Sequence, residues 1–233
     1  GPASGSPGKG ICPMTSPTSL PTSAGRFNGG LRRLGLSLFA CVFAPCAFAA
    51  PQQAAPSPAS LNDGPYIFNE QGKLQAAWLC DGEVISETVV RQQTLPPRCA
   101  YPYPINIPAF ATSDAMPYRG QRIIAISDIH GQFGLMVRLL QANGVIDEQG
   151  RWKAGDAHLV ITGDVFDRGP QVTEAVWLLL QLQGQARQVG GEVHYLLGNH
   201  ETMVLSGDVR YVNPKYVDVA KRLKRSVNGL YAK

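Results

Sequence analysis

The second half of the chain contains two kinds of apolar pattern, which are short continuous runs typical of buried strands and spaced positions typical of helices. Residues 122–127, 158–162 and 192–197 are apolar runs of strand length. Between them, residues 133–142 and 172–187 place apolar side chains at helical spacing. This order predicts a β-α-β-α-β unit with right-handed crossovers and a largely parallel sheet, which is the α/β class.

The preceding part of the chain shows a different pattern. Three short β-rich runs, at residues 66–68, 74–80 and 83–90, are separated by turn signals and predict a small antiparallel meander. Residues 96–108 are rich in proline, which cannot donate a ladder hydrogen bond, so we expect an irregular surface connection without chemistry there. We interpret residues 61–118 as an amino-terminal β extension of the domain that follows.

Composition narrows the possible classes of protein. The chain has 233 residues, of which 44% are hydrophobic, and this excludes a wholly disordered or fibrous chain. There are 21 basic and 17 acidic side chains, but four of the basic ones and none of the acidic ones lie in the first 50 residues. The remainder is neutral, so we expect no nucleic-acid partner.

A pattern typical of a signal peptide occupies about residues 26–50. Arg32 and Arg33 precede a mostly apolar run at residues 34–44, and Ala47-Phe48-Ala49 provides small residues for cleavage. The run is about half as long as a bilayer core requires, so we expect no permanent membrane span in the mature chain. We expect cleavage near Ala49 or Ala50 and a periplasmic or secreted location.

The leader therefore covers residues 1–50, a linker covers residues 51–60, and one domain covers residues 61–233. The alternatives for the apolar run are a buried core helix and a lipoprotein signal at Leu38-Phe39-Ala40-Cys41. Outside the leader the only cysteines are Cys80 and Cys99. In an oxidising compartment we expect a disulfide between them, and two buried free thiols are the alternative.

Polar clusters directly follow the three predicted strands. Asp128 and Asp164 are 36 positions apart, and Asp164 and Asn199 are 35 positions apart, which is one strand-helix-strand unit each time. Because the carboxyl ends of parallel strands meet at one edge of a sheet, we expect all three clusters to form one site there.

The residue types in these clusters favour phosphate chemistry at divalent ions. Carboxylate, imidazole and amide ligands suit manganese, iron or zinc, and the two carboxylate oxygens of Asp164 are suited to bridging a pair of ions. Arg168 offers a planar fork for phosphate oxygens. His200 is suited to protonating a leaving alkoxide, and Asp167 to holding that imidazole in the right tautomer.

The three clusters, with the sequences DIHG, GDVFDRG and GNHE, resemble the calcineurin-like metallophosphoesterases of the phosphoprotein-phosphatase type. The flanking sequence is most similar to the Shewanella-like protein phosphatases, through residues 63–66, 144–148 and 207–212. The similarity begins at about residue 61 and continues to the last residue. It implies a calcineurin-like metallophosphoesterase sandwich.

The same resemblance implies two divalent metal ions, which are manganese, iron or zinc. Asp128 and His130 would ligate the first ion, Asp164 would bridge both, and Asn199 would ligate the second. A metal-bound hydroxide would then attack phosphorus in line, without a phosphoenzyme.

The resemblance also assigns substrate binding and acid catalysis. Arg168 would hold the phosphoryl oxygens, and Asn199 would contact phosphate. His200, paired with Asp167, would be the general acid, and Glu201 would stabilise the loop. The implied function is a metal-dependent phosphomonoesterase that acts on phosphotyrosine or phosphoserine/threonine in peptides and proteins, or on a small phosphoester.

The sequence departs from this family after Glu201. The family supplies two further histidine ligands and usually a second phosphate-binding arginine from later loops, but none of the 32 residues after Glu201 is a histidine. We therefore expect the carboxyl-terminal half of the domain to be missing. Residues 51–233 alone are then expected to bind at most one ion, to show little phosphatase activity and to be poorly soluble. His158 and His194 lie within strand runs, where we expect structural roles.

Residues 214–225 combine apolar and basic side chains. We expect an amphipathic surface helix with a solvated basic face, and a lining of the substrate cleft is the alternative. Two alternative functions remain open. One is a nucleotide hydrolase of the diadenosine-tetraphosphate or cyclic-nucleotide type, which shares the three motifs. The other is a truncated, non-catalytic remnant that binds one metal ion or a partner protein.

Overall fold

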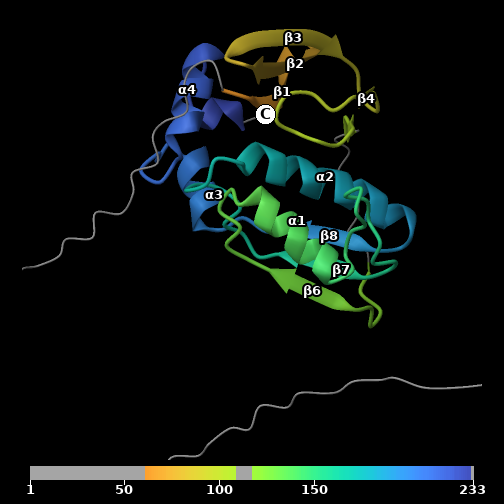
Figure 1. Cartoon of the computed structure of the whole chain (residues 1–233). Coiled ribbons are helices and arrows are strands. Elements are labelled where there is room, and N and C mark those ends of the chain that lie inside the picture. Colours follow the sequence, from red (N-terminus) through yellow and green to blue (C-terminus); the bar gives the residue numbers. More distant parts are fainter. Residues whose placement is uncertain (1–60, 109–116, 232–233) are drawn as a thin grey trace, which may run out of the picture. The chain divides into compact units, whose positions relative to one another are not determined.

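The structure of the protein, a computed structural model, describes residues 61–108 and 117–231 (Figure 1). The predicted signal peptide and linker lie outside the described residues. Within the described ranges, no helix combines the length and the apolar character that a membrane span requires.

The amino-terminal part forms the predicted antiparallel meander. Its strands are β1 (Asp63–Glu70), β2 (Lys73–Cys80) and β3 (Glu83–Val89), in the spatial order β1-β2-β3. The connecting turns, Gln71-Gly72 and Asp81-Gly82, have positive φ at both residues. A type I′ hairpin turn requires this conformation, which explains the glycine at the second position of each turn.

The chain after the meander forms a short strand pair, and a disulfide joins its proline-rich segment to β2. β4 (Thr94–Leu95) pairs antiparallel with β5 (Ile105–Asn106). Cys80 and Cys99 form the predicted disulfide, with their Cα atoms 5.3 Å apart. The expectation of an irregular surface connection at residues 96–108 was wrong, because the prolines flank the paired residues and because Tyr101 and two isoleucines of the segment are buried in the main core.

The β-α-β-α-β prediction is confirmed. The parallel strands β6 (Ile123–Ile126), β7 (His158–Ile161) and β8 (Glu192–Tyr195) lie in the order β6-β7-β8, and they are connected through α1 (Phe133–Ala142) and α2 (Val172–Gln188). Each strand ends one or two residues earlier than the apolar run predicted. The sheet therefore stops before the polar clusters, which form loops beyond its carboxyl edge.

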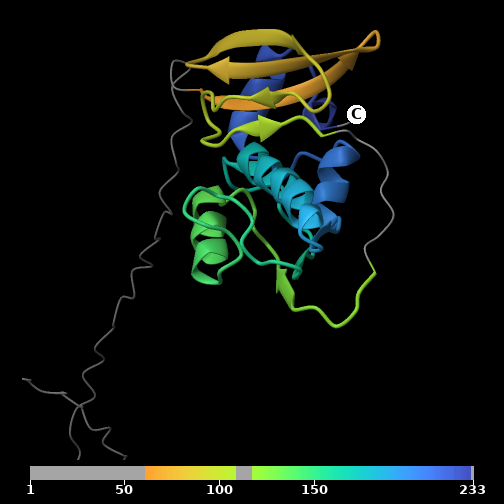
Figure 2. The same cartoon turned by 90° about the vertical axis from the view of Figure 1, so that its right-hand side faces the viewer.

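Helices α1 and α2 cover one face of the parallel sheet, and the meander lies beyond α2 (Figures 1 and 2). On the covered face Leu159, Ile161 and Val193 are buried. Trp177 of α2 joins the helix layer to the meander by donating its indole N–H to the carbonyl of Pro65, at 2.7 Å. On the opposite face of the sheet, Ile123 at the edge strand is 55% exposed, whereas His158, which pairs with it in register, is 3% exposed.

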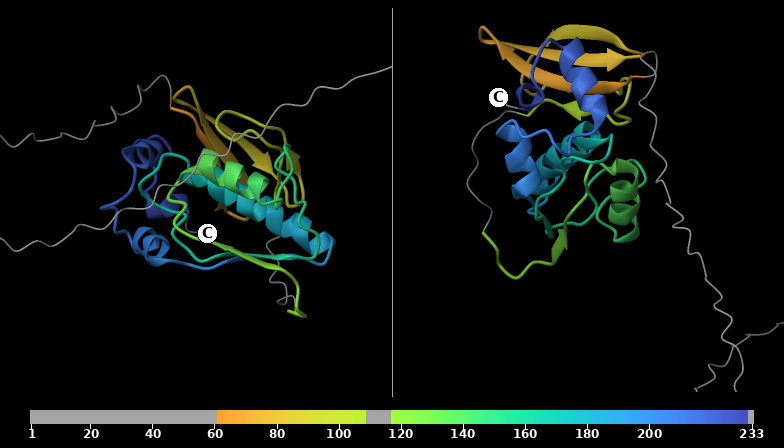
Figure 3. Two further views of the ribbon diagram at one scale, coloured as in Figure 1. Left: turned by 60° about the horizontal axis from the view of Figure 1, so that its bottom comes forward. Right: turned by 90° about the vertical axis from the view of Figure 1, so that its left-hand side faces the viewer.

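Two helices and a short 3-10 turn follow the sheet: α3 (Asn199–Leu205), α4 (Pro214–Arg222) and η2 (Asn228–Leu230). The α3 helix was not predicted. The α4 helix packs Val219 and Ala220 into an apolar cluster with residues of β1 and β2, so it lies directly against the meander (Figure 3).

The prediction for α4 was correct in its amphipathic character and wrong in one part of its basic face. Lys215 is only 7% exposed, and its ammonium group lies 3.4 Å from a carboxylate oxygen of Asp63 and 3.7 Å from one of Glu174. The sequence pattern of α4 predicted that Lys215 faces solvent, but two buried carboxylates from distant parts of the chain lie beside its charge.

Candidate active site

The three polar clusters meet at the carboxyl edge of the parallel sheet, as their spacing predicted. Backbone hydrogen bonds connect the first loop to the second: His130 donates its N–H to the carbonyl of Asp164, and Gly131 donates to that of Val165, both at 2.9 Å. In return, Gly169 donates to the carbonyl of His130 at 2.9 Å. The close approach requires glycine, because a Cβ atom on Gly131 would lie 2.6 Å from the carbonyl oxygen of Gly169.

Five predicted site residues have left-handed backbone conformations. The φ angles of Asp128, His130, Asp164, Asp167 and Arg168 lie between 44° and 69°. A residue other than glycine is strained in this conformation, and the strain persists only where contacts from the surrounding structure hold the backbone in place. Ordinary surface turns do not concentrate so many strained residues, so the loops at this edge of the sheet are unusual.

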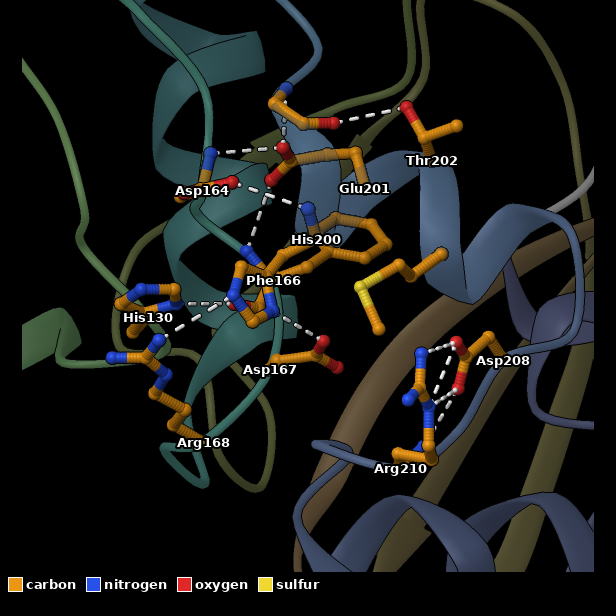
Figure 4. Close-up of polar contacts among 12 residues, drawn as sticks. His130, Asp164, Phe166, Asp167, Arg168, His200, Glu201, Thr202, Asp208 and Arg210 are labelled. Atoms are coloured by element: carbon orange, nitrogen blue, oxygen red, sulfur yellow. Dashed lines mark hydrogen bonds and ion pairs between the residues drawn. The ribbon is translucent and has the colours of Figure 1, made fainter.

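Glu201 is the acceptor that connects the second loop to the third. Its carboxylate is buried and accepts backbone N–H groups from residues 164, 165, 166 and 198 at 2.7 to 3.0 Å, with the Tyr195 hydroxyl at 3.1 Å. Figure 4 shows the contacts with Asp164 and Phe166. Burial disfavours the charged carboxylate, but the backbone donors outweigh it and hold the pKa of Glu201 below its ordinary value.

His130 has the geometry of a metal ligand. Its Nδ1 lies 2.8 Å from the carbonyl oxygen of Phe166, which only accepts hydrogen bonds, so Nδ1 carries the proton. The other nitrogen, Nε2, is buried and has no hydrogen-bond partner. In the neutral ring this nitrogen presents a lone pair, and a backbone carbonyl on the opposite nitrogen is the usual support of a metal-bound histidine.

His200 and Asp167 form a buried pair. The Nδ1 of His200 lies 2.7 Å from an oxygen of Asp167, and both residues are at most 4% exposed. Because the carboxylate fixes the Nδ1 proton, Nε2 is the nitrogen that can exchange a proton with a ligand. This nitrogen lies 3.4 Å from the guanidinium of Arg168, so the proposed acid and phosphate-binding group point toward each other (Figure 4).

The structure brings together most of the predicted metal ligands. Ligand atoms of the predicted ligands His130 and Asp164 lie within 4.8 Å of each other and of His200, which was predicted as the acid and not as a ligand. A carboxylate oxygen of Asp128 is 4.0 Å from Nε2 of His130. Asp128 is exposed and accepts a hydrogen bond from the Ser127 hydroxyl at 2.6 Å. The set of carboxylate and imidazole donors fits a divalent ion such as manganese, iron or zinc.

Two further predictions have less direct support. Asn199 begins α3 at the same edge and is exposed, so its placement is compatible with a ligand but forms no buried cluster. His158 and His194 lie on β7 and β8 outside the three clusters, with Nδ1 of the first 3.0 Å from Nε2 of the second.

Several residues at the site were not identified from the sequence. The ring of Tyr211 lies 5.4 Å from the ring of His200, and Asn213 donates its side-chain N–H to the carbonyl of Arg168 at 2.9 Å. Both lie in the turn between α3 and α4, which has no periodic pattern. The only sequence signal there was the family resemblance at residues 207–212, which assigns no side-chain contact.

Comparisons with known proteins identify the family that these motifs resemble. Residues 121–231 match the family model described as calcineurin-like phosphoesterase. The chain is similar to the Shewanella-like protein phosphatase 2 of Arabidopsis thaliana, with 37% identity over 41% of this chain and 24% of the relative. It is also similar to the Shewanella-like protein phosphatase 1 of Plasmodium berghei, with 38% identity over 42% of this chain and 27% of the relative.

Among solved structures, the chain is similar to a cold-active protein-tyrosine phosphatase of a psychrophilic Shewanella species. The identity is 39%, the TM-score is 0.65, and the match covers 73% of this chain and 53% of the other. A mutant of a cold-active protein tyrosine phosphatase matches with 38% identity and a TM-score of 0.67. The chain thus spans about half the length of these structures and about a quarter of the curated relatives.

Proposed function

Since residues 121–231 match the calcineurin-like phosphoesterase family and carry the three motif loops, we propose that the protein is a metal-dependent phosphomonoesterase that acts on phosphorylated peptides or proteins. The observation that carries this proposal is the buried pair of Asp167 and His200, in which Nε2 of the imidazole lies 3.4 Å from the guanidinium of Arg168. An acid and a phosphate-binding fork side by side supply two of the functions that cleavage of a phosphoester needs, which are protonation of the leaving group and binding of the phosphoryl oxygens.

The residues divide the chemistry among them. Arg168 binds the phosphoryl oxygens through its planar fork. His200 delivers a proton from Nε2 to the leaving oxygen, and Asp167 stabilises the imidazolium before that transfer. Divalent ions at Asp128, His130, Asp164 and Asn199 would supply charge neutralisation at the phosphoryl group.

The substrate class is part of the proposal. Solved relatives are named protein-tyrosine phosphatases, and curated relatives are named Shewanella-like protein phosphatases. We extend this to phosphotyrosine or phosphoserine/threonine in peptides and proteins. A nucleotide hydrolase is the competing outcome, because the three motif loops by themselves select phosphate and not the group attached to it.

Location in the periplasm or outside the cell completes the proposal. Its support is the signal-peptide pattern at residues 26–50 together with the Cys80–Cys99 disulfide. Disulfides persist in oxidising compartments and are rare in the cytosol. Amino-terminal sequencing of the protein from its natural host should find a start near residue 50, and an intact product that retains Arg32 and Arg33 in the cytosol would contradict export.

The function is tested by turnover with the protein recovered from its natural host and supplied with manganese. We expect release of phosphate from phosphotyrosine or phosphoserine peptides and none from diadenosine tetraphosphate. Asp164→Asn should abolish turnover, and Asp156→Asn, the same change at an exposed aspartate before β7, should not. Preferential cleavage of the dinucleotide would replace the protein-phosphatase proposal, and full activity of Asp164→Asn would exclude the site.

A further inference from the structure

The turn between α3 and α4 and the first residues of α4 contact the loop that carries Arg168. We call residues 211–216 the clamp. It lies within the described part of the chain, and its side chains come from a region with no motif residue of the proposed reaction. The clamp contacts the loop at two points, Arg168 and Pro170.

At the first point the clamp holds both peptide groups of Arg168. The N–H of Arg168 donates to the carbonyl of Tyr211 at 2.9 Å, and the side-chain amide of Asn213 donates to the carbonyl of Arg168 at 2.9 Å. Arg168 has φ of 63°, and Asp167 before it has φ of 69°. Two adjacent side chains in this conformation need outside support, and these hydrogen bonds supply it on both sides of Arg168.

At the second point two side chains of α4 share the carbonyl of Pro170. Lys215 donates from Nζ at 2.6 Å, and the Tyr216 hydroxyl donates at 3.0 Å. The same hydroxyl accepts the backbone N–H of Val172 at 2.6 Å and that of Thr173 at 3.3 Å, so it caps the first turn of α2. The loop is therefore fixed to α2 and to α4 by one phenol.

The position of Lys215 is itself fixed. Its ammonium group is buried and lies near the buried carboxylates of Asp63 in β1 and Glu174 in α2. Moving this ammonium group to solvent would remove the cation that lies beside both buried acids, which is unfavourable. The contact of α4 with Pro170 is thus continuous with the attachment of α4 to the meander.

We propose that Asn213, Lys215 and Tyr216 are positioning residues that hold Arg168 in its phosphate-binding conformation. The proposal rests on the proposed function, because it assumes that Arg168 binds phosphate. A purely structural role would affect the stability of α4 and leave phosphate binding unchanged. Substitutions of Asn213 can distinguish the two roles, because its side-chain oxygen caps α4 whereas its side-chain nitrogen contacts Arg168.

The side-chain oxygen of Asn213 accepts the N–H of Lys215 at 3.1 Å and so caps α4, whereas its nitrogen contacts Arg168. Aspartate is as good a helix cap as asparagine but has no N–H to donate. Asn213→Asp therefore keeps the cap and removes the contact with Arg168. Asn213→Ala removes both and adds no charge.

The test measures binding of inorganic phosphate to the full chain in manganese by titration calorimetry, with thermal unfolding in parallel. We expect both Asn213 variants to weaken phosphate binding by about two- to tenfold, which is the usual effect of one lost hydrogen bond. The Tm should fall further for Asn213→Ala than for Asn213→Asp, because only the alanine variant also loses the cap of α4. Asn143→Ala is the matched control, because Asn143 donates its amide to a helix carbonyl, that of Leu139, at 2.8 Å and lies at the far end of α1.

Arg168→Ala tells the two proposals apart. If it weakens phosphate binding and both Asn213 variants bind like the unmodified chain, the clamp is structural only and this inference is wrong. If Asn213→Asp alone weakens binding, its added charge is the cause and the inference is again wrong. If Arg168→Ala has no effect, the phosphate role of Arg168 in the proposed function fails and the inference fails with it.

Hydrogen exchange gives a second readout that does not require phosphate. The amide of Arg168 is held by Tyr211, next to the contact that Asn213 makes. We expect Asn213→Asp to increase exchange at residues 168 and 169 severalfold and to leave residues 214–222 of α4 unchanged. Unchanged exchange at Arg168 would overturn the inference even in a chain that binds phosphate weakly.

Discussion

Glu201→Gln should strongly destabilise the site loops and the domain that carries them. Oε2 of Glu201 accepts the N–H groups of Asp164 and Gly198, while Oε1 accepts those of Val165 and Phe166 together with the Tyr195 hydroxyl. Glutamine retains one oxygen and replaces the other by an amide that only donates. Two N–H groups then lose their acceptor whichever way the amide turns: the buried pair of Val165 and Phe166 or the half-buried pair of Asp164 and Gly198.

The magnitude follows from that count. An unsatisfied buried donor costs about 1 to 3 kcal/mol, so two of them cost about 2 to 6 kcal/mol. The total stability of a domain is about 5 to 15 kcal/mol, so the loss is a large part of it. The size of the loss depends on the burial of Glu201, which is 1% exposed.

Urea unfolding followed by tryptophan fluorescence at neutral pH measures the change in the free energy of unfolding. Glu148→Gln is the control, because Glu148 is exposed and the same substitution there should change stability by less than about 0.5 kcal/mol. A loss below 1 kcal/mol for Glu201→Gln would show that the backbone donors find other acceptors, and the account of the loops would be refuted.

The pH dependence gives an independent check on Glu201. Its pKa is lower in the folded protein than the ordinary value of 4.5, because the backbone donors outweigh burial. The stability that it contributes is therefore complete above pH 4.5 and is lost as pH falls through the folded pKa. The unmodified protein should lose this contribution on acidification, and Glu201→Gln should not show that loss.

Two further predictions concern the fold around the site. Replacing Cys80 and Cys99 together by serine should lower the free energy of unfolding by about 3 kcal/mol on the loop-entropy estimate, since the disulfide closes a loop of 19 positions. A reductant should then destabilise the unmodified protein and not the variant, and equal sensitivity would exclude the bond. Gly131→Ala should cost about 1 to 3 kcal/mol, because φ is 63° and the added Cβ would meet the backbone of Gly169, whereas Gly134→Ala in α1 meets open space and should be neutral or slightly stabilising. Equal unfolding midpoints for the two alanine variants would contradict the close packing of the loops.

The sequence predicted the elements whose pattern is local. The helix at residues 133–142 has the predicted bounds, because apolar spacing begins it and Asn143-Gly144 ends it. The last strand was predicted two residues too long, since Leu196 and Leu197 are apolar but are 52% and 64% exposed beyond the sheet. An apolar run does not reveal where a strand stops pairing.

Features that depend on distant partners were missed or misjudged. Lys215 was assigned to solvent because its partners, Asp63 and Glu174, are far away in the sequence. The even spacing of Asp128, Asp164 and Asn199 correctly placed three loops at one edge, since that spacing is itself a property of the sheet. No such spacing in the sequence indicates the role of Asn213. Its contact with Arg168 depends on the path of the turn between α3 and α4, which has no periodic sequence pattern.

The central claim is that His200, oriented by Asp167, acts as the acid beside a phosphate held at this edge. It is tested by leaving-group dependence in the protein from its natural host. His200→Asn should lower turnover of a phosphomonoester with a poor leaving group by roughly 10² to 10⁴, the usual effect of a general acid, and should lower turnover of an activated aryl phosphate much less. His194→Asn, the same change outside the clusters, should alter neither turnover. Equal losses for both substrates with His200→Asn would contradict acid catalysis and indicate a metal-binding or structural role for His200.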